Sequence, residues 1–281
     1  MARERMSATV TAERTVDTER RLRYAIGDGW VLTKRNLITY VRKPDLLVFS
    51  TIQPVMFVLL FVYVFGGAMK LALPAGLPYV DFLMPGIFVQ TAIFAATQTG
   101  VGLAEDLKKG LVDRFRSLPM ARSAVLSGRT LADSAAIAFQ VVLMLVVAVL
   151  VGFRLHAGLP KGLLALAGAL SVGYAFTWMF ALAGLSLKSV EAVQAASFTL
   201  IFPFVFASSA FVPADTFPHW LQSWSKVNPV SIWVDTFRDL TLGHLNPAGE
   251  NLMTHLWQST AWFLAILVIF VPLSVRLYRK T

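Results

Sequence analysis

The segment "EDLKKGLVDRFRSLP", residues 105–119, places seven charged side chains between two strongly apolar stretches of the chain. The preceding stretch, about 82–104, and the following one, about 130–153, each have the length of a membrane-spanning helix, which takes roughly 20 apolar residues. A charged segment between two such stretches is typical of a connection that leaves the membrane. The pattern therefore predicts a chain that crosses a bilayer more than once.

The composition of the whole chain agrees with this prediction. Of 281 residues, 56% are hydrophobic and 15% are charged, and the mean hydropathy of +0.64 is far above that of a soluble domain. The net charge of +9 does not indicate a nucleic-acid partner, because the basic residues lie beside apolar stretches and not on one solvated module. The chain has no cysteine, which excludes disulfides, thiolate metal sites and a cysteine nucleophile.

Six segments have the length and composition of spanning helices, which predicts an all-α membrane protein with six spans. The predicted spans cover about 46–65, 82–104, 130–153, 162–187, 192–212 and 257–276. The connection "KSVE" at 188–191 is so short that the fourth and fifth spans are expected to be adjacent and antiparallel.

The basic residues also predict the orientation of these spans. Of the 25 lysines and arginines, 20 lie on the side that holds both termini, the 105–129 connection and Lys188. Because cytoplasmic loops carry the excess of Lys and Arg, that side is expected to be the cytoplasm. The chain is then a multi-pass protein with both termini inside the cell.

Flanking segments complete the predicted layout. Residues 1–26 are expected to be a flexible cytoplasmic extension, and 27–281 a single transmembrane domain. Within that domain, 30–43 has the pattern of an amphipathic helix on the inner leaflet, where membrane lipid covers its apolar face. Between Pro229 and Gly243 a second short helix is expected to lie at, or dip into, the outer interface.

The charged segment itself has the pattern of a short amphipathic helix that stops at Pro119. An apolar stripe is formed by Leu107, Leu111, Phe115 and Leu118. Glu105 and Asp106 are expected to open its first turn, and Arg114 and Arg116 to close its last, as the helix dipole favours. The pattern alone fits either an ordinary solvated loop or a helix that docks on a partner.

Several polar and aromatic residues lie within the predicted spans. Five glutamines are of interest, and they are Gln53, Gln90, Gln98, Gln140 and Gln194. They are expected either to hydrogen-bond between helices or to contact a transported substrate. Phenylalanines recur in the fifth span, and Phe198, Phe202 and Phe206 suit either a lipid-facing or dimer surface or the lining of a path for an aromatic or lipid-like cargo.

Other residues in the spans have structural explanations. Arg129 and Asp133 are four residues apart at the entry to the third span, so they are expected to pair on one helix face, and we interpret this pair as structural. Small residues in the fourth span, Gly168, Gly173 and Gly184, predict close packing against other helices.

The stretch "EDLKKGLVDRFRSLPMARSAVLSGRTLAD" resembles the cytoplasmic signature of ABC type-2 transporter permeases. The matching residues are Glu105, Gly110, Asp113, Arg114, Leu118, Pro119, Arg122, Gly128 and Arg129. The outer stretch 211–240, with its Asn228–Pro229 step, is similar to permeases of the daunorubicin-resistance type. A departure is "KKGL" at 108–111, where many relatives carry "EKGT", so contacts made through that acid and hydroxyl are not expected here.

The resemblance implies an exporter of the bacterial inner membrane. It implies a complex of two permeases, as a homodimer or with a paralogue, and two ATP-binding subunits. It also implies that 105–118 is the coupling helix, which transmits ATP-driven closure of those subunits to the spans. ATP and Mg²⁺ are expected on the partner, because this chain has no "GxxxxGK[ST]" phosphate loop and no Gly-Lys dipeptide.

The sequence does not predict an enzyme or a metal site. His156, His219, His244 and His255 have no "HExxH" spacing or other metal-ligand motif. The favoured function is export of a hydrophobic or amphipathic drug or lipid. Alternatives are a polysaccharide or lipid-linked glycan exporter of the same superfamily, an ion-gradient-driven transporter, and a non-transporting membrane anchor or lipid-modifying enzyme.

Overall fold

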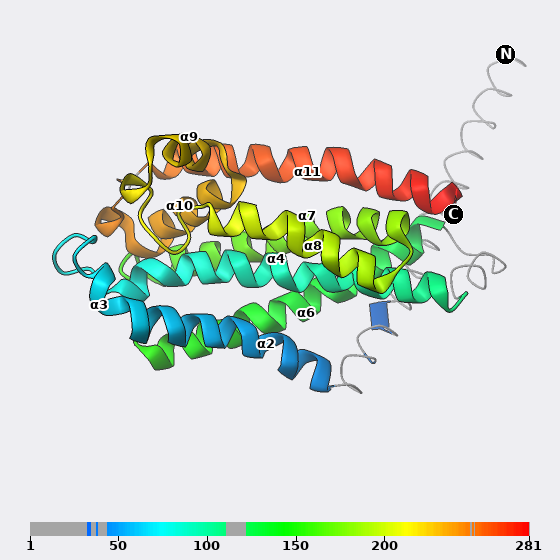
Figure 1. Ribbon diagram of the computed structural model, residues 1–281, viewed down its shortest axis with the longest axis horizontal. Helices are drawn as coiled ribbons and strands as arrows, with labels where there is room; N and C mark the ends of the chain where they lie inside the picture. Colours follow the sequence, from blue (N-terminus) through cyan, green and yellow to red (C-terminus); the bar gives the residue numbers. More distant parts are fainter. Residues whose placement is uncertain are drawn as a thin grey trace, which may run out of the picture.

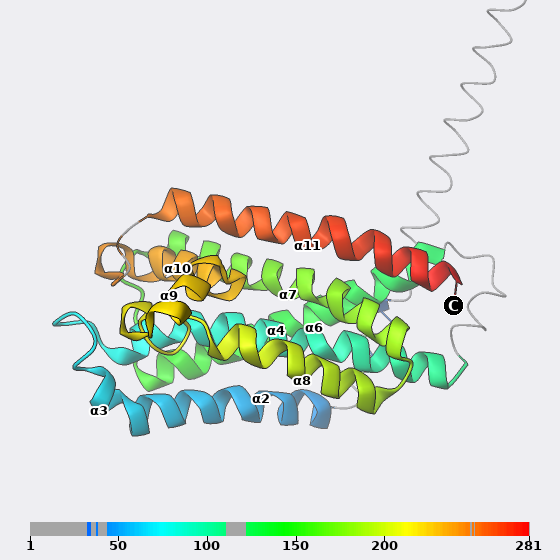
Figure 2. The ribbon, with the colours of Figure 1, turned by 45° about the horizontal axis from the view of Figure 1, so that its top comes forward.

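A computed structural model describes residues 33, 34, 38, 44–110, 122–247, 249 and 251–280. Every regular element within these ranges is helical. The long helices run side by side in an elongated bundle, with α11 and α2 at opposite edges in both views (Figures 1 and 2). The end of α4 and the C-terminus of the chain lie at one end of this bundle, and α3, α9 and α10 lie at the other.

The helices follow the predicted spans closely. They are α2 (Pro44–Leu59), continued by the π-helix η1 (Leu60–Phe65) and by α3 (Gly66–Met69), then α4 (Tyr79–Lys108), α6 (Arg122–Val151), α7 (Leu159–Leu187), α8 (Val190–Phe206) and α11 (Leu252–Lys280). Five stretches within them are long and apolar enough to cross a membrane, and α8 is apolar but has only 17 residues.

The fifth predicted span, 192–212, is therefore too long at its end, because α8 stops at Phe206. The structure gives a physical reason for this early end. The side-chain amide nitrogen of Asn228, Nδ2, donates to the carbonyl oxygens of Phe204, at 2.7 Å, and Ala207, at 3.2 Å. These bonds satisfy carbonyls at the end of α8 that no further helical turn could bind.

The centre of the bundle is α4, which is buried along most of its length by α2, α6, α7, α8 and α10. Its crossing with α7 is close because a glycine of each helix lies there. A methyl group on Gly184 would overlap the carbonyl oxygen of Gly100. Gly168 lies against Phe237, and Gly173 lies against Ile137. The prediction that the three glycines of the fourth span mark close packing is confirmed.

The segment between α8 and α11 contains η2 (Ala214–Thr216), α9 (His219–Val227), α10 (Pro229–Leu242) and η3 (Gly243–Leu245). As predicted, α10 begins at Pro229 and ends before Gly243, and Asn228 caps it by accepting from the backbone N–H of Val230. Helix α10 packs among α4, α7, α8 and α11 and nearly all its residues are buried, so its apolar face is covered by protein, and its position at the outer interface stays a prediction. Burial is possible because the charged side chains of α10 find partners inside the protein.

The charged connection also differs from the prediction. Helix α4 runs past the expected end of the second span and stops at Lys108, and Gly110 has a φ of +67°. Glu105 and Asp106 therefore lie in the last turn of α4 and do not open a separate helix. Carboxylates are disfavoured at that end of the helix dipole, and basic partners compensate them. The Nζ atom of Lys109 lies 2.9 Å from Glu105 Oε2.

The remainder of the predicted docking helix lies outside the described residues, including Leu111, Arg114, Phe115, Arg116 and Leu118. Leu107 of the predicted stripe is partly buried and packs against an apolar cluster that includes Leu103 and Leu126. Most of the predicted interfacial helix at 30–43 also lies outside the described residues, as does the extension 1–26.

Candidate functional site

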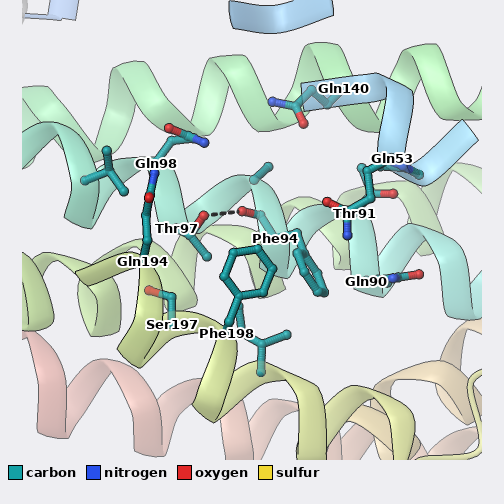
Figure 3. A pocket seen from close by; sticks show the side chains of 14 residues that line it. Gln53, Gln90, Thr91, Phe94, Thr97, Gln98, Gln140, Gln194, Ser197 and Phe198 are labelled. Atoms are coloured by element: carbon teal, nitrogen blue, oxygen red, sulfur yellow. Dashed lines mark hydrogen bonds between the residues drawn. The ribbon is translucent and has the colours of Figure 1, made fainter. Parts of the chain in front are cut away.

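Five glutamines of the predicted spans, Gln53, Gln90, Gln98, Gln140 and Gln194, line one cavity of about 190 Å³. It lies between α2, α4, α6 and α8, and Figure 3 shows the side chains around it. Its lining consists of Gln53, Pro54, Gln90, Thr91, Phe94, Ala95, Thr97, Gln98, Val101, Gln140, Gln194, Ser197, Phe198 and Ile201. Residues from four helices, separated by up to 148 positions in the sequence, thus form one polar site within an apolar bundle.

Helix α4 supplies half of the lining through its regular spacing. Gln90, Phe94, Gln98 and Val101 recur at intervals of three or four residues and therefore share one face of the helix. From Gln90 to Gln98 this face extends about 12 Å along the axis. The opposite wall comes from α8, with Gln194, Ser197 and Phe198, and the remaining lining comes from α2 and α6.

The electrostatic character of the cavity is neutral and polar. None of its lining residues carries a charge. Three buried oxygens, Oε1 of Gln90, Oγ1 of Thr91 and Oγ of Ser197, have no hydrogen-bond partner among the described residues. The exposed fractions of these residues are 3%, 1% and 4%. Because buried polar atoms in native proteins almost always have a partner, these three atoms are suited to bind a molecule that enters the cavity.

An aromatic column leads from the cavity toward α3. The rings of Phe198 and Phe202 are 5.9 Å apart, and those of Phe202 and Phe206 stack at 4.8 Å. Phe211 continues the column, 5.2 Å from Phe206 and 4.7 Å from Phe61 of η1. Such separations are those of favourable ring contacts. We call these five rings the phenylalanine column.

The structure brings the predicted path residues together in part. Gln53, Gln90, Gln98 and Phe198 line the cavity, whereas Phe202 and Phe206 lie beyond it in the phenylalanine column. The sequence prediction missed Thr91, Phe94 and Thr97. Their spacing from Gln90 and Gln98 on a single helical face is the signal that could have found them.

A second polar cluster lies where α4 ends and α6 begins. Arg129 donates from Nη1 to Oδ2 of Asp106, at 2.8 Å, and from Nε to Oδ2 of Asp133, at 3.2 Å. The expected pair with Asp133 is thus present, and Asp106 joins it from α4. The guanidinium packs against Gly102 so closely that a Cβ atom at that position would collide with it.

A third cluster lies at the opposite end, around Arg238 of α10. Its guanidinium donates to Asp235 at 3.0 Å and to the carbonyl oxygens of Phe82, Ser209 and Ala210 at 3.1, 2.6 and 3.2 Å. The same group lies 3.6 Å from the centre of the Phe82 ring. Burial lowers the pKa of Arg238 to about 10 and Asp235 opposes the shift, so the side chain stays charged at neutral pH. Arg238 thereby holds α4, α10 and the segment after α8 together.

Two further carboxylates, one on α10 and one on α4, make contacts with histidines at this end. Asp239 accepts from Asn246 and lies 2.6 Å from Nδ1 of His255 in α11, and Asp81 of α4 lies 2.7 Å from Nε2 of His156. Within the described parts of the chain, no group of three or more His, Asp or Glu residues is arranged to hold a metal ion.

Comparisons with known proteins agree with this architecture. The family model described as "ABC-2 type transporter" matches residues 28–242. The chain is 31% identical over 250 residues to the daunorubicin resistance ABC transporter permease protein DrrB1 of Streptomyces coeruleorubidus, covering 88% of this chain and 84% of the relative.

Two further relatives are also named as permeases. The putative transport permease ycf38 of Cyanophora paradoxa is 28% identical, over 77% of this chain and 75% of the relative. The probable doxorubicin resistance ABC transporter permease protein DrrC of Mycobacterium tuberculosis is 26% identical, over 88% of this chain and 87% of the relative. With a family model that covers most of its length and a bundle of apolar helices, the chain belongs to the ABC-2 type transporter family, as an integral, multi-pass membrane permease.

Proposed function

We propose that this chain is the permease subunit of an ATP-driven exporter, and that it carries an amphipathic compound, a drug or a lipid, out across the bacterial inner membrane. The observation that carries the proposal is the glutamine-lined cavity between α2, α4, α6 and α8. Its inner wall is buried at Gln90, Thr91 and Gln140, and its outer residues Gln98 and Gln194 are exposed on this chain. Polar groups in a membrane interior are costly, and substrate paths are among the places where they occur.

The cavity and the phenylalanine column together form the proposed path. Polar parts of a cargo would bind to the glutamines, and its apolar parts would slide along the rings from Phe198 to Phe61. Much of Phe198, Phe202 and Phe206 is exposed on the surface of this single chain. In the proposed complex, a second permease, identical or paralogous, faces these rings and closes the path.

Energy would come from a separate partner. Two ATP-binding subunits would hold ATP and Mg²⁺ and dock on the connection that follows α4. We propose residues 105–118 as the coupling segment, with Leu111, Phe115 and Leu118 in the contact and Arg114 and Arg116 orienting it. Arg129 would then transmit its movement, because its bonds to Asp106 and Asp133 tie α4 to α6 on either side of that segment.

The orientation follows from charge. The connection after α4 belongs to the side that carries 20 of the 25 lysines and arginines, so that side and both termini are placed in the cytoplasm. The cluster around Arg238 is then at the outer face. The extension 1–26 precedes a single transmembrane domain, which spans 27–281.

Transport by inside-out membrane vesicles tests the proposal. Vesicles with this permease and an ATP-binding subunit from the same genome should take up a fluorescent amphipathic cargo when ATP is added. The double variant Leu111→Asp and Phe115→Asp should lose both transport and co-purification of the ATP-binding subunit. If both survive in this variant, the coupling role of the segment is wrong. If no ATP-dependent uptake occurs with any drug or lipid cargo, the export function is wrong.

A further inference from the structure

The glutamine cavity is distinguished by the absence of charge around its polar groups. Carboxamides and hydroxyls from Gln53, Gln90, Thr91, Thr97, Gln98, Gln140, Gln194 and Ser197 supply its hydrogen-bonding atoms. Along α4 the nearest ionisable residues are Asp81, nine positions before Gln90, and Glu105, seven positions after Gln98. They are therefore about 13 Å and about 10 Å along the axis from the polar face of the cavity.

The acids around the cavity also have partners of their own. Asp81 accepts from the backbone N–H of Arg154 at 2.8 Å and lies beside His156. Glu105 pairs with Lys109 in an exposed position. Neither carboxylate is placed to balance an ammonium group between Gln90 and Gln98.

The acids of the neighbouring helices are likewise engaged. Asp133, seven positions before Gln140 on α6, shares Arg129 with Asp106. Glu191, one turn before Gln194 at the exposed start of α8, accepts from the hydroxyl of Ser189 and does not line the cavity. An anionic phosphate in the cavity would also find no counter-charge, because no arginine or lysine is among the residues that line it.

The cost of an unpaired ion decides what this cavity can hold. The inner wall of the cavity is buried at Gln90, Thr91, Gln140 and Ser197, and none of these residues carries a charge. A charged group taken from water to this wall is strongly disfavoured because it finds no counter-charge there, whereas a neutral polar group needs only hydrogen bonds. A carboxamide can donate and accept at once, so it suits hydroxyl and carbonyl groups in either role. The free oxygens of Gln90, Thr91 and Ser197 are acceptors for hydroxyl donors, and Phe94 and Phe198 provide flanking rings.

Resting on the proposed export function, we propose that the part of the cargo held in the glutamine cavity is uncharged and rich in hydroxyl and carbonyl groups. This chemistry occurs in two sources, a neutral sugar on a lipid and an oxygenated aromatic drug. A cationic amino group or an anionic phosphate is excluded from the cavity. Because the cavity holds the polar part of the cargo, a charge on that part should weaken binding.

Binding to the full-length permease in lipid nanodiscs tests this proposal without the ATP-binding subunit. One pair of probes is daunorubicin, whose amino group is protonated at neutral pH, and N-acetyl-daunorubicin, which differs in lacking that charge. A second pair is a glucosyl diacylglycerol and a phosphatidylglycerol with the same acyl chains. Fluorescence anisotropy measures the drugs, and native mass spectrometry measures the lipids.

We expect the neutral member of at least one pair to bind about tenfold more tightly than its charged counterpart. Tighter binding of N-acetyl-daunorubicin than of daunorubicin identifies an oxygenated aromatic drug as the source of this chemistry. Tighter binding of the glucosyl lipid than of phosphatidylglycerol identifies a neutral sugar on a lipid. Equal affinity within both pairs, tighter binding of the charged members, or no binding of either neutral probe would overturn the proposal.

Charge variants sharpen the comparison. Gln90→Glu and Gln194→Glu keep the side-chain size but add a carboxylate to the lining, so they should reverse the drug preference in favour of daunorubicin. Gln258→Glu is the matched control, because Gln258 is exposed on α11 and does not line the cavity. Its drug preference should equal that of the unchanged chain. Variants with unchanged selectivity at Gln90 and Gln194 would contradict the assignment of the site.

The two proposals fail in different ways. Selective binding of neutral probes without ATP-dependent uptake in vesicles would reject the export function and keep the character of the site. ATP-dependent uptake with no preference for neutral probes would keep the export function and reject the uncharged character of the site.

Discussion

Arg129 of α6 and Asp106 of α4 form an ion pair of 2.8 Å, and Asp133 binds the same guanidinium at 3.2 Å. The two helices joined by this pair are those that flank the connection 109–121. We therefore expect a movement of that connection to act on α4 and α6 together. Since α4 also forms one wall of the glutamine cavity, the pair provides a mechanical link between the proposed docking segment and the proposed path.

Replacing Arg129 by Gln should uncouple the two ends of this link. Asp106 and Asp133 would lose their common partner, and we expect a loss of about 1–3 kcal/mol in the free energy of unfolding together with weaker ATP-dependent transport. Thermal unfolding of the purified permease and vesicle uptake measure the two effects. Lys226→Gln is the control, because Lys226 is exposed on α9 at the other end of the bundle and does not line the cavity, so its replacement should change neither quantity. Equal behaviour of the two variants would refute the link.

The crossing of α4 and α7 should not tolerate a methyl group. In Gly184→Ala the new Cβ atom would overlap the backbone carbonyl of Gly100, which can move only with its helix. Overpacking of this kind costs about 1–3 kcal/mol, so the unfolding temperature should fall. Gly67→Ala serves for comparison, since nothing lies within 4 Å of the position that its methyl group would take. That variant should be unchanged or slightly more stable, because Ala favours a helix over Gly. A stable Gly184→Ala protein would show that the helices are farther apart.

Arg238 should be essential for folding at the end of the bundle that holds α9 and α10. Arg238→Met leaves Asp235 without its cation and removes the donor from three backbone carbonyls, those of Phe82, Ser209 and Ala210. Breaking a buried pair from one side costs about 3–5 kcal/mol, so we expect low expression and a clearly lower unfolding temperature. The Arg154 side chain is exposed, and Arg154→Met should be close to neutral. Similar stabilities for both variants would be incompatible with the Arg238 cluster.

The sequence predicted local features well, because they depend on residues close together in the chain. Apolar length located the helices, Pro229 and Gly243 marked the limits of α10, and the four-residue spacing of Arg129 and Asp133 indicated their pair. Each of these features is decided within a few turns of one helix.

Features that depend on packing between distant segments were not predictable in the same way. A single sequence does not say which face of α8 turns toward α4, so the convergence of Gln194 with Gln90 and Gln53 could not be derived. The burial of α10 was missed for a related reason. Arg238 donates to three backbone carbonyls on other segments, those of Phe82, Ser209 and Ala210, and no local pattern reveals these contacts.

Cysteine accessibility tests the central claim, that the glutamine cavity is a water-accessible part of the transport path. The chain has no cysteine, so single substitutions can be labelled without background. Gln98→Cys and Ser197→Cys place a thiol in the cavity, Val268→Cys places one on the exposed apolar surface of α11, and Ser274→Cys places one in the buried core.

The measurement is the rate at which a charged, membrane-impermeant thiol reagent modifies each variant in native membranes. A thiol must ionise to react, and it does so in water but not in hydrocarbon. The account predicts rapid modification at Gln98 and Ser197, slowed by a bound cargo, and little modification at Val268 and Ser274. Equal protection of all four positions, or modification at Val268 with none at Gln98 and Ser197, would contradict it.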